Sequence, residues 1–182
     1  MKRIIPFVQE QIKNHLNQDS FAIDATMGNG FDTLFLAKHC KEVYAFDIQK
    51  AALNKTKDLL KKERLNNVNL IHDSHEFMAL YTVSNIDVVV FNLGYLPNQD
   101  KTITTKKTST LDAIQQSIML LNKGGLIAVT FYPGHAEGAC EVEYIIPYLE
   151  SLCNKHYEVL RYEFINKTKS PFTVFIKKLR SD

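Results

Sequence analysis

Short apolar runs typical of buried strands alternate along this chain with longer segments of helical periodicity. The clearest strand is Ile86-Asp-Val-Val-Val-Phe91, which is rich in β-branched residues and nearly continuous in its hydrophobicity. Such runs belong in the middle of a parallel sheet that is covered on both faces. Five strand–helix alternations of this kind require crossover connections, and they predict a Rossmann-like, doubly wound α/β fold.

The same periodicities set the expected limits of the elements. Strands are predicted at 21–24, 42–47, 68–71, 86–91, 126–132, 158–165 and 172–178. Helices are predicted at 4–16, 33–40, 49–63, 110–122 and 136–152. Ser109 or Thr110 is the expected N-cap of its helix, and Pro147 is expected to kink or interrupt the helix that contains it. The last two strands have no helix between them, which predicts an antiparallel C-terminal hairpin at one edge of a seven-stranded, mostly parallel sheet.

Size and composition limit the organisation of the chain. The 182 residues are 45% hydrophobic and 23% charged, which suits a single domain over 1–182 and excludes a disordered chain. No apolar run approaches the ~20 residues that span a bilayer, and the apolar stretch behind Met1-Lys2-Arg3 is broken by Pro6, so neither a membrane span nor an export signal is predicted. The three cysteines lack C-x-x-C spacing, which indicates a reducing cytoplasm, and no His/Cys/Asp cluster has the spacing of a metal site.

A glycine loop follows the first predicted strand, in the sequence Asp24-Ala-Thr-Met-Gly-Asn-Gly-Phe-Asp-Thr33. Gly28 and Gly30 permit a close approach of the backbone to a ligand, which would meet the free amides at the helix N-terminus. A dinucleotide fingerprint would need a third glycine at the position of Thr33, so that interpretation is disfavoured. An acid before the glycines suits a cationic ligand head, such as the amino group of methionine. For the glycines alone, a tight turn without a ligand is the alternative.

An acidic residue also ends the second predicted strand, and another follows the third. Asp47 is at the position of a carboxylate that accepts both ribose hydroxyls of an adenosine, or else it caps the following helix. Asp73-Ser74 falls where an adenine amino group could be hydrogen-bonded, or else it forms a turn. The glycine loop and Asp47 together favour an adenosine-containing ligand.

Polar and aromatic residues follow the fourth and fifth predicted strands, at the carboxyl edge where ligands bind in such folds. Asn92 can accept a hydrogen bond from an amine through its carbonyl oxygen, and Tyr95 could stack on a flat substrate such as a base. Tyr132 and His135 come after the fifth strand. Simple packing of Tyr95 and helix capping by His135 are the alternatives without a function.

Basic residues gather in two places. Seven Lys or Arg residues lie between Lys155 and Arg180, against two Glu residues. The Thr-rich segment 102–110 is predicted to form a loop over the carboxyl edge and carries further lysines. Solvated lysines are the simpler interpretation of the charge alone, but such faces also permit contacts with phosphate groups.

These motifs, in this order, resemble the class I S-adenosylmethionine-dependent methyltransferases. Thr26 stands where that superfamily usually has the first glycine of D-x-G-x-G-x-G. The glycine loop, Phe91-Asn-Leu-Gly-Tyr-Leu-Pro97 and Tyr132-x-Gly-His135 more closely resemble the bacterial YtqB/MnmM family, which is labelled as rRNA methylases, and this resemblance covers nearly the whole chain. That family includes a tRNA methyltransferase that converts 5-aminomethyl-2-thiouridine at wobble position 34 to 5-methylaminomethyl-2-thiouridine.

The resemblance implies a role for each matching residue. S-adenosyl-L-methionine would be bound by Asp24, Met27, Gly28, Asn29, Gly30, Asp32, Asp47, Ile48, Gln49, Asp73 and Ser74. The catalytic residues would be Asn92, Tyr132 and His135. The RNA would contact Tyr95, Lys101, Lys106, Lys107, Arg161, Lys167 and Lys169.

The implied reaction is N-methylation of the wobble uridine in the anticodon stem-loop of tRNA. The amine must be neutral to react, and we expect positioning to dominate, with no single residue indispensable as a base. An rRNA methyltransferase or a small-molecule N-methyltransferase with the same cofactor site is the alternative. The short chain leaves little room for a substrate lid, which favours a large substrate on an open edge.

Two other function classes are weaker. An NAD-linked oxidoreductase is disfavoured by Thr33 and by the lack of a second domain. A non-catalytic binding module would not need both the glycine loop and the carboxylates. The C-terminal hairpin or the helix at 4–16 is expected to pair two copies in a homodimer.

Overall fold

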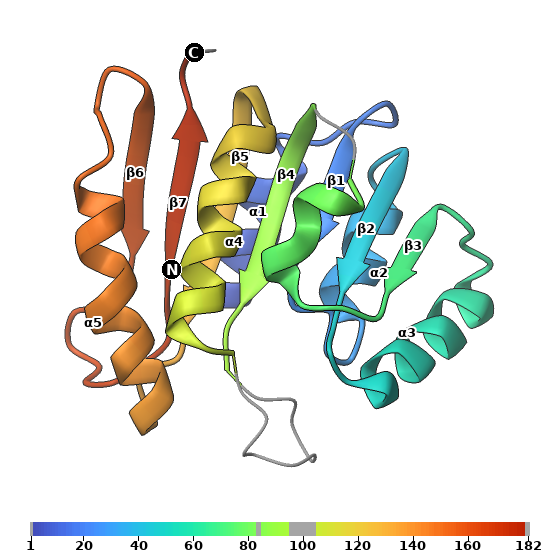
Figure 1. Cartoon of the computed structure of the whole chain (residues 1–182), viewed down its shortest axis with the longest axis horizontal. Coiled ribbons are helices and arrows are strands. Elements are labelled where there is room, and N and C mark those ends of the chain that lie inside the picture. The colour runs from blue at the N-terminus through green and yellow to red at the C-terminus, as the bar shows by residue number, and fades with distance from the viewer. Residues whose placement is uncertain (1, 83–84, 95–104, 181–182) are drawn as a thin grey trace.

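The computed structural model describes residues 2–82, 85–94 and 105–180. Its seven-stranded sheet has the order β3-β2-β1-β4-β5-β7-β6 (Figure 1). The strands are β1 (Phe21–Asp24), β2 (Glu42–Phe46), β3 (Val68–Ile71), β4 (Ile86–Asn92), β5 (Leu121–Phe131), β6 (Tyr157–Tyr162) and β7 (Phe172–Lys178). The first five are parallel, and β7 runs antiparallel to both β5 and β6. The predicted doubly wound sheet with an antiparallel C-terminal hairpin is therefore confirmed.

Helices cover both faces of the sheet (Figure 1). One face packs against α1 (Ile4–Lys13), α2 (Phe31–Ala37) and α3 (Lys50–Glu63). The other packs against the short 3₁₀ helix η1 (His75–Leu80), α4 (Lys107–Leu120) and α5 (Ala136–Glu150). No helix within these described ranges is long and apolar enough to cross a membrane.

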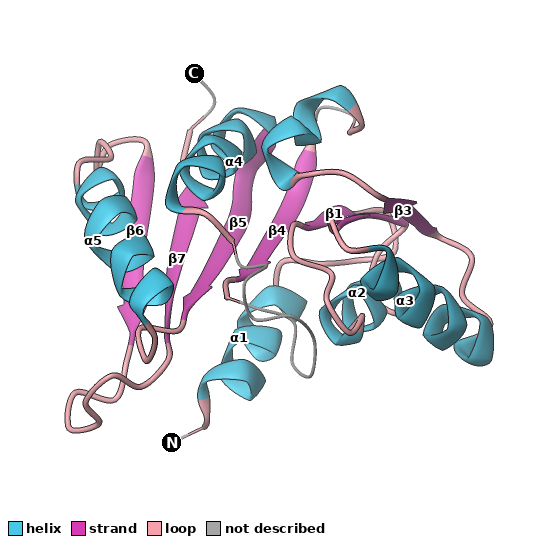
Figure 2. Cartoon of the chain, turned by 60° about the horizontal axis from the view of Figure 1, so that its bottom comes forward, coloured by secondary structure: helices cyan, strands magenta, loops and turns pink. Residues whose placement is uncertain are grey.

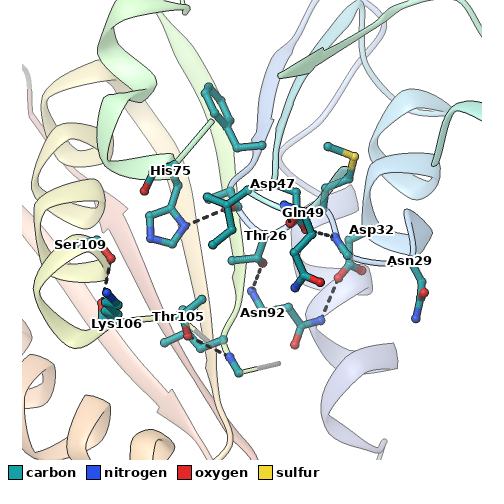
Figure 3. Close-up of a pocket in the computed structure, with 18 of the residues that line it drawn as sticks. Thr26, Asn29, Asp32, Asp47, Gln49, His75, Asn92, Thr105, Lys106 and Ser109 are labelled. Atoms are coloured by element: carbon teal, nitrogen blue, oxygen red, sulfur yellow. Dashed lines mark hydrogen bonds between the residues drawn. The ribbon is translucent and has the colours of Figure 1, made fainter. Parts of the chain in front are cut away.

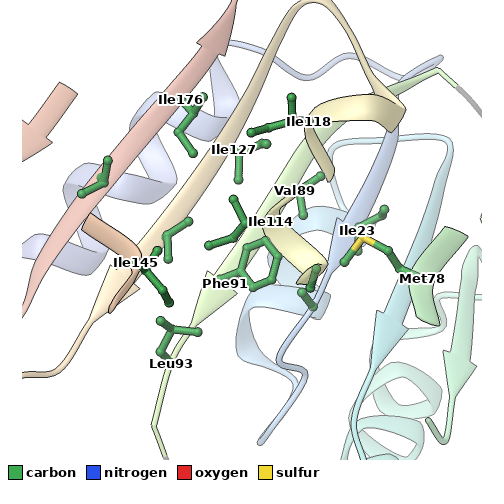
Figure 4. Packing of buried hydrophobic residues seen from close by; sticks show 14 of the residues in the cluster. Ile23, Met78, Val89, Phe91, Leu93, Ile114, Ile118, Ile127, Ile145 and Ile176 are labelled. Atoms are coloured by element: carbon green, nitrogen blue, oxygen red, sulfur yellow. The ribbon is translucent and has the colours of Figure 1, made fainter. Parts of the chain in front are cut away.

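The central strand β4 explains why two layers of helices are needed. Val89 and Phe91 belong to the apolar cluster under α4 and α5 (Figure 4), whereas Val88 and Val90 belong to the cluster under α1 to α3. Successive side chains of a strand point to opposite faces, so an apolar run buries residues on both. Each such side chain contributes about 1.5–3 kcal/mol when it is fully buried.

Several element limits differ from the sequence-based prediction. The helix α4 begins at Lys107 with Lys106 as an N-cap that makes no side-chain bond, so neither Ser109 nor Thr110 caps it. Part of the predicted Thr-rich loop is therefore the first turn of this helix. The helix α5 continues through Pro147 to Glu150, because a proline this close to the end removes only one amide donor.

The carboxyl ends of the parallel strands share one edge of the sheet, at the bottom of Figure 1 and turned forward in Figure 2. Phe131, the last residue of β5, pairs with Phe172, the first residue of β7. The connection between β6 and β7 therefore reaches the same edge as the loops after β1, β2, β4 and β5. The glycine loop, Asp47, Asp73-Ser74, Asn92 and Tyr132 therefore all lie at this edge.

Candidate active site

A cavity of about 900 Å³ lies at the carboxyl edge of the sheet, between the loops that follow the first five strands. Its wall combines the start of α2, the start of η1 and the residues just before and within the first turn of α4 (Figure 3). Most of the predicted site residues line it: Met27, Gly28, Asn29, Asp32, Asp47, Ile48, Gln49, Asp73, Ser74, Asn92, Lys106, Tyr132 and His135. Tyr95 and Lys101 lie outside the described residues.

Asp24 and Gly30 do not line the cavity. Asp24 is fully buried behind the loop, where its carboxyl accepts the hydroxyl of Thr33 at 2.6 Å and the amide of Thr26 at 3.2 Å. Burial, and next the nearby carboxylate of Asp32, raise the pKa of Asp24 to about 7. The expectation that Asp24 faces a cationic ligand is corrected accordingly: this side chain orders the glycine loop from inside.

The raised pKa of Asp24 predicts a pH dependence of stability. An unfolded aspartate titrates near 3.9, so between about pH 4 and pH 7 the folded protein binds one proton more than the unfolded chain. The free energy of unfolding should therefore fall as the pH rises through this window, by up to about 1.4 kcal/mol per pH unit from this group. Asp24→Asn removes this contribution and should flatten the profile, measured by urea unfolding at pH 5, 6, 7 and 8.

The exposed Asp58 on α3 supplies the matched control for this prediction. Asp58→Asn should leave the slope of the wild-type profile unchanged. An Asp24→Asn profile as steep as that of the wild-type protein would show that Asp24 does not carry the extra proton.

Asp47 closes the loop after β2 onto the glycine loop. Its two carboxylate oxygens accept the amide of Gly28 at 2.9 Å and the amide of Gln49 at 2.8 Å. Burial raises the pKa of Asp47, and the bonds to the Gln49 and Gly28 amides oppose that rise. A carboxylate has about four acceptor positions, so Asp47 keeps capacity for hydroxyl groups of a ligand in the cavity.

Three polar side chains form a hydrogen-bonded chain across the base of the cavity. The Asn92 amide nitrogen donates to Asp32 at 2.9 Å, and the Tyr132 hydroxyl donates to the Asn92 oxygen at 2.7 Å. A carboxylate can only accept, so Asp32 decides which end of the amide carries the nitrogen. The carbonyl oxygen of Asn92 is thus fixed, with one lone pair left for another donor. Figure 3 shows the bond between Asn92 and Asp32 that sets this orientation.

Neither Tyr132 nor His135 is arranged as a proton acceptor. Burial, and next the charge of Asp32, raise the pKa of Tyr132 to about 12, so the hydroxyl stays protonated near neutral pH. His135 caps α5 by accepting the amide of Gly138 on Nδ1 at 3.1 Å, while the Glu137 carboxylate lies 3.7 Å from that nitrogen. A neutral ring bonded in this way carries its proton on Nε2. Both residues therefore present hydrogen-bond donors.

His75 is a buried residue of the cavity wall whose importance the sequence did not reveal. Its Nδ1 donates to the carbonyl of Ala25 at 3.0 Å (Figure 3), and burial lowers the pKa of the ring. The neutral ring therefore has a lone pair on Nε2, and this buried nitrogen has no partner within the described part of the chain. The ring therefore supports the loop at Ala25 from inside the cavity wall.

The helix α1 adds two residues that sequence reasoning also missed. Ile5 and Gln9 line the cavity, and the Gln9 amide reaches Asp32 at 3.5 Å. The helical periodicity of Ile5, Val8, Ile12 and Leu16 predicts the core-facing side of this helix, whereas the structure buries Ile4, Val8 and Ile12 and leaves Ile5 at the cavity. Nothing in the sequence places the opposite side of α1 against the glycine loop.

The predicted RNA-binding residues are only partly brought together. Lys106 lines the cavity, whereas the Lys107 ammonium lies over the ring of Tyr144 on α5. Arg161 pairs with Glu163 at 2.8 Å and stacks on Phe172, so its charge is already engaged. Lys167 and Lys169 belong to the β6–β7 connection, at the same edge as the cavity.

Within the described ranges, no group of three or more His, Cys, Asp or Glu side chains could hold a metal ion. Cys40 is buried, Cys140 and Cys153 are exposed, and all three are free thiols.

Comparison with known proteins finds a family model and a relative that match this chain. Residues 43–178 match a family model described as "Putative rRNA methylase". A chloroplastic protein of Arabidopsis thaliana, "tRNA (mnm(5)s(2)U34)-methyltransferase", is 34% identical over 94% of this chain. The chain spans 66% of the length of that relative.

Two crystal structures have nearly the same fold over their whole length. A "putative rRNA-methylase" from Clostridium thermocellum is 36% identical and superposes with a TM-score of 0.95, with 98% of each chain covered. A "putative methyltransferase" from Streptococcus mutans, solved in complex with SAH, is 38% identical with a TM-score of 0.93, with 98% of this chain and 99% of that chain covered.

Proposed function

The chain belongs to the family described as "Putative rRNA methylase" and is an S-adenosylmethionine-dependent methyltransferase, and from this premise we propose that it N-methylates the aminomethyl group of 5-aminomethyl-2-thiouridine at wobble position 34 of tRNA. The observation that carries the proposal is the fixed carbonyl oxygen of Asn92, an acceptor suited to an amine at the base of the cavity. The name of the Arabidopsis relative supports the same substrate.

The residues present fit the cofactor. A volume of about 900 Å³ is within the range of pockets that enclose a molecule of this size. The adenosyl group carries hydroxyl donors, and the wall offers an acceptor for them in the Asp47 carboxylate. We infer that the cofactor is bound by those residues that were predicted to bind it and that line the cavity. Asp24 and Gly30, which do not line it, support the glycine loop from behind.

When bound, S-adenosylmethionine supplies an electrophilic methyl group. The residues of the chain then have to present a neutral amine, because an ammonium group has no lone pair. The Asn92 oxygen can accept one N–H of that amine and so direct its lone pair. Tyr132 donates to Asn92 and so holds its carbonyl oxygen in place, and the proton that the amine gives up leaves to solvent. Positioning is therefore the main contribution of these side chains.

A tRNA loop suits the surroundings of this cavity. Lys106 in the wall and Lys167 and Lys169 on the adjacent connection could contact phosphate groups, and the wobble base is already unpaired, so little energy is needed to bring it into the cavity. We further propose that residues 1–182 act as one domain, that the protein works in the cytoplasm on the anticodon stem-loop, and that two copies pair as a homodimer.

The decisive experiment compares acceptors in vitro. Purified protein and labelled S-adenosylmethionine are incubated with tRNA that carries 5-aminomethyl-2-thiouridine, with the same tRNA lacking the aminomethyl group, with ribosomal RNA, and with the free nucleoside. Nucleoside mass spectrometry should find 5-methylaminomethyl-2-thiouridine only in the first sample.

Each other outcome identifies one rival. Label in ribosomal RNA would replace the proposal with an rRNA methyltransferase, and efficient methylation of the free nucleoside would favour a small-molecule enzyme. Equal label in tRNA with and without the aminomethyl group would place the reaction at another atom.

A further inference from the structure

We propose that Glu141 is a positioning residue for the methyl transfer, and that it fixes the backbone beside Asn92 through the hydroxyl of Thr105. Glu141 itself does not line the cavity. It belongs to α5 and is only 2% exposed. The role of Glu141 in the reaction rate rests on the proposed function. The contacts of Glu141 that suggest this role do not depend on it.

Gly94 and Thr105 hold each other at the cavity wall by two hydrogen bonds. The Gly94 amide donates to the Thr105 hydroxyl oxygen at 3.0 Å, and the Thr105 amide donates to the Gly94 carbonyl at 3.2 Å. Figure 3 shows the first of these bonds beside Asn92. The preceding amide, that of Leu93, still bonds to β5 at Thr130. The chain thus leaves the sheet at Gly94, and the two bonds to Thr105 fix the backbone of Gly94 at the cavity wall.

The Thr105 hydroxyl needs an acceptor of its own. Its oxygen already receives the Gly94 amide, so its single proton has to be donated elsewhere, and the Glu141 carboxyl receives it. The Thr110 hydroxyl, in the first turn of α4, donates to the same carboxyl at 3.3 Å. Glu141 therefore joins α5 and α4 to the wall of the cavity.

Burying a carboxyl group at this position costs desolvation free energy. Burial raises the pKa of Glu141 to about 7, against the opposing effect of its bonds to Thr105 and Thr110. An apolar side chain would avoid this desolvation, but it would leave the half-buried hydroxyl of Thr105 and the buried hydroxyl of Thr110 without this acceptor. The carboxyl group of Glu141 is therefore best explained by its contact with Thr105, which in turn holds Gly94 in place.

The consequence for the reaction is geometric. Without Glu141 the Thr105 hydroxyl can turn, its bond to Gly94 weakens, and the backbone two residues after Asn92 loses its second anchor. A displacement of about 1 Å in a positioning group can lower a rate by about a hundredfold. Binding of the cofactor near Asp47 depends on other loops and should be affected little.

The test compares Glu141→Ala, Glu141→Gln and Thr105→Val with Glu143→Ala, which alters an exposed glutamate of the same helix. On the tRNA substrate, Glu141→Ala and Thr105→Val should each lower kcat by about ten- to a hundredfold, with the calorimetric Kd for S-adenosylmethionine changed by less than about threefold. Glu141→Gln keeps one acceptor oxygen and should recover most of the rate. The double variant Glu141→Ala/Thr105→Val should be no slower than either single variant, because both changes break one chain of contacts.

Amide hydrogen exchange separates this inference from the proposed function. The Gly94 amide should exchange at least about tenfold faster in Glu141→Ala and Thr105→Val than in Glu143→Ala, whatever the substrate proves to be. If the Gly94 amide exchanges faster in these variants but the wild-type protein does not methylate the tRNA, the proposed substrate is wrong. The anchoring role of Glu141 then still stands. Unchanged exchange, an unchanged kcat in Thr105→Val, or additive losses in the double variant would overturn the role of Glu141.

Discussion

Replacing Asn92 with alanine is expected to lower kcat for the tRNA substrate by about a hundred- to a thousandfold. The change removes the fixed carbonyl oxygen and leaves Asp32 and the Tyr132 hydroxyl without the partner between them. The cofactor has other contacts, so its Kd, measured by calorimetry, should change by less than about threefold. Single-turnover methylation with saturating cofactor measures the rate loss directly.

A matched control exists at the opposite edge of the sheet, where β5 begins beside the start of β4. Asn122 donates to the Asp87 carboxylate at 2.8 Å, which is the same kind of bond far from the cavity. Asn122→Ala should lower stability about as much as Asn92→Ala and leave kcat within about twofold of the wild-type value. If Asn92→Ala retains more than about a tenth of the wild-type kcat, the amine is oriented by another group.

Gly30→Ala should lower the free energy of unfolding by about 2–4 kcal/mol. Two costs add at this residue. Its φ of +80° lies in the left-handed region, which favours glycine, and a Cβ atom would lie 2.5 Å from the Thr56 hydroxyl oxygen. Thr56 is fully buried on α3, so it has little freedom to move away. Urea unfolding measures the loss.

A comparison with Gly124 separates the cost of the left-handed backbone conformation from the cost of the contact with Thr56. Its φ is +83°, but a Cβ atom there would have nothing within 4 Å. Gly124→Ala should therefore cost only the backbone part, about 1 kcal/mol. In a Thr56→Ala background the loss caused by Gly30→Ala should approach that smaller value. Equal losses for the two glycine variants in the wild-type background would show that the contact with Thr56 is unimportant.

The sheet could be predicted from the sequence because the patterns that indicate it lie in residues that are neighbours along the chain. The β-branched run at Ile86–Phe91 and the missing helix between the last two strands each follow from neighbouring residues, and both features of the sheet are confirmed. The limits of α4 are different. Ser109 and Thr110 have the side chains of an N-cap, but Thr110 is buried against Glu141 of α5, and contacts of that kind depend on the tertiary structure.

The site could be predicted by position but not by orientation. Asp47 and Asn92 were found because each follows a strand, and parallel strands bring their carboxyl ends together. Spacing along the chain does not show that Thr33 turns Asp24 inward, that Gln9 reaches Asp32, or that the cap on α5 fixes the proton on His135. These properties depend on hydrogen bonds between residues that only the fold brings into contact.

The position of β7 between β5 and β6 has a consequence for synthesis on the ribosome. The strand β6 emerges before β7, yet β7 is its only neighbour in the sheet. A nascent chain that has released β6 therefore carries two open edges, on β5 and on β6, with no native way to close either. Such open edges are where chaperones bind or aggregation begins at this stage, and release of β7 would remove both edges at once.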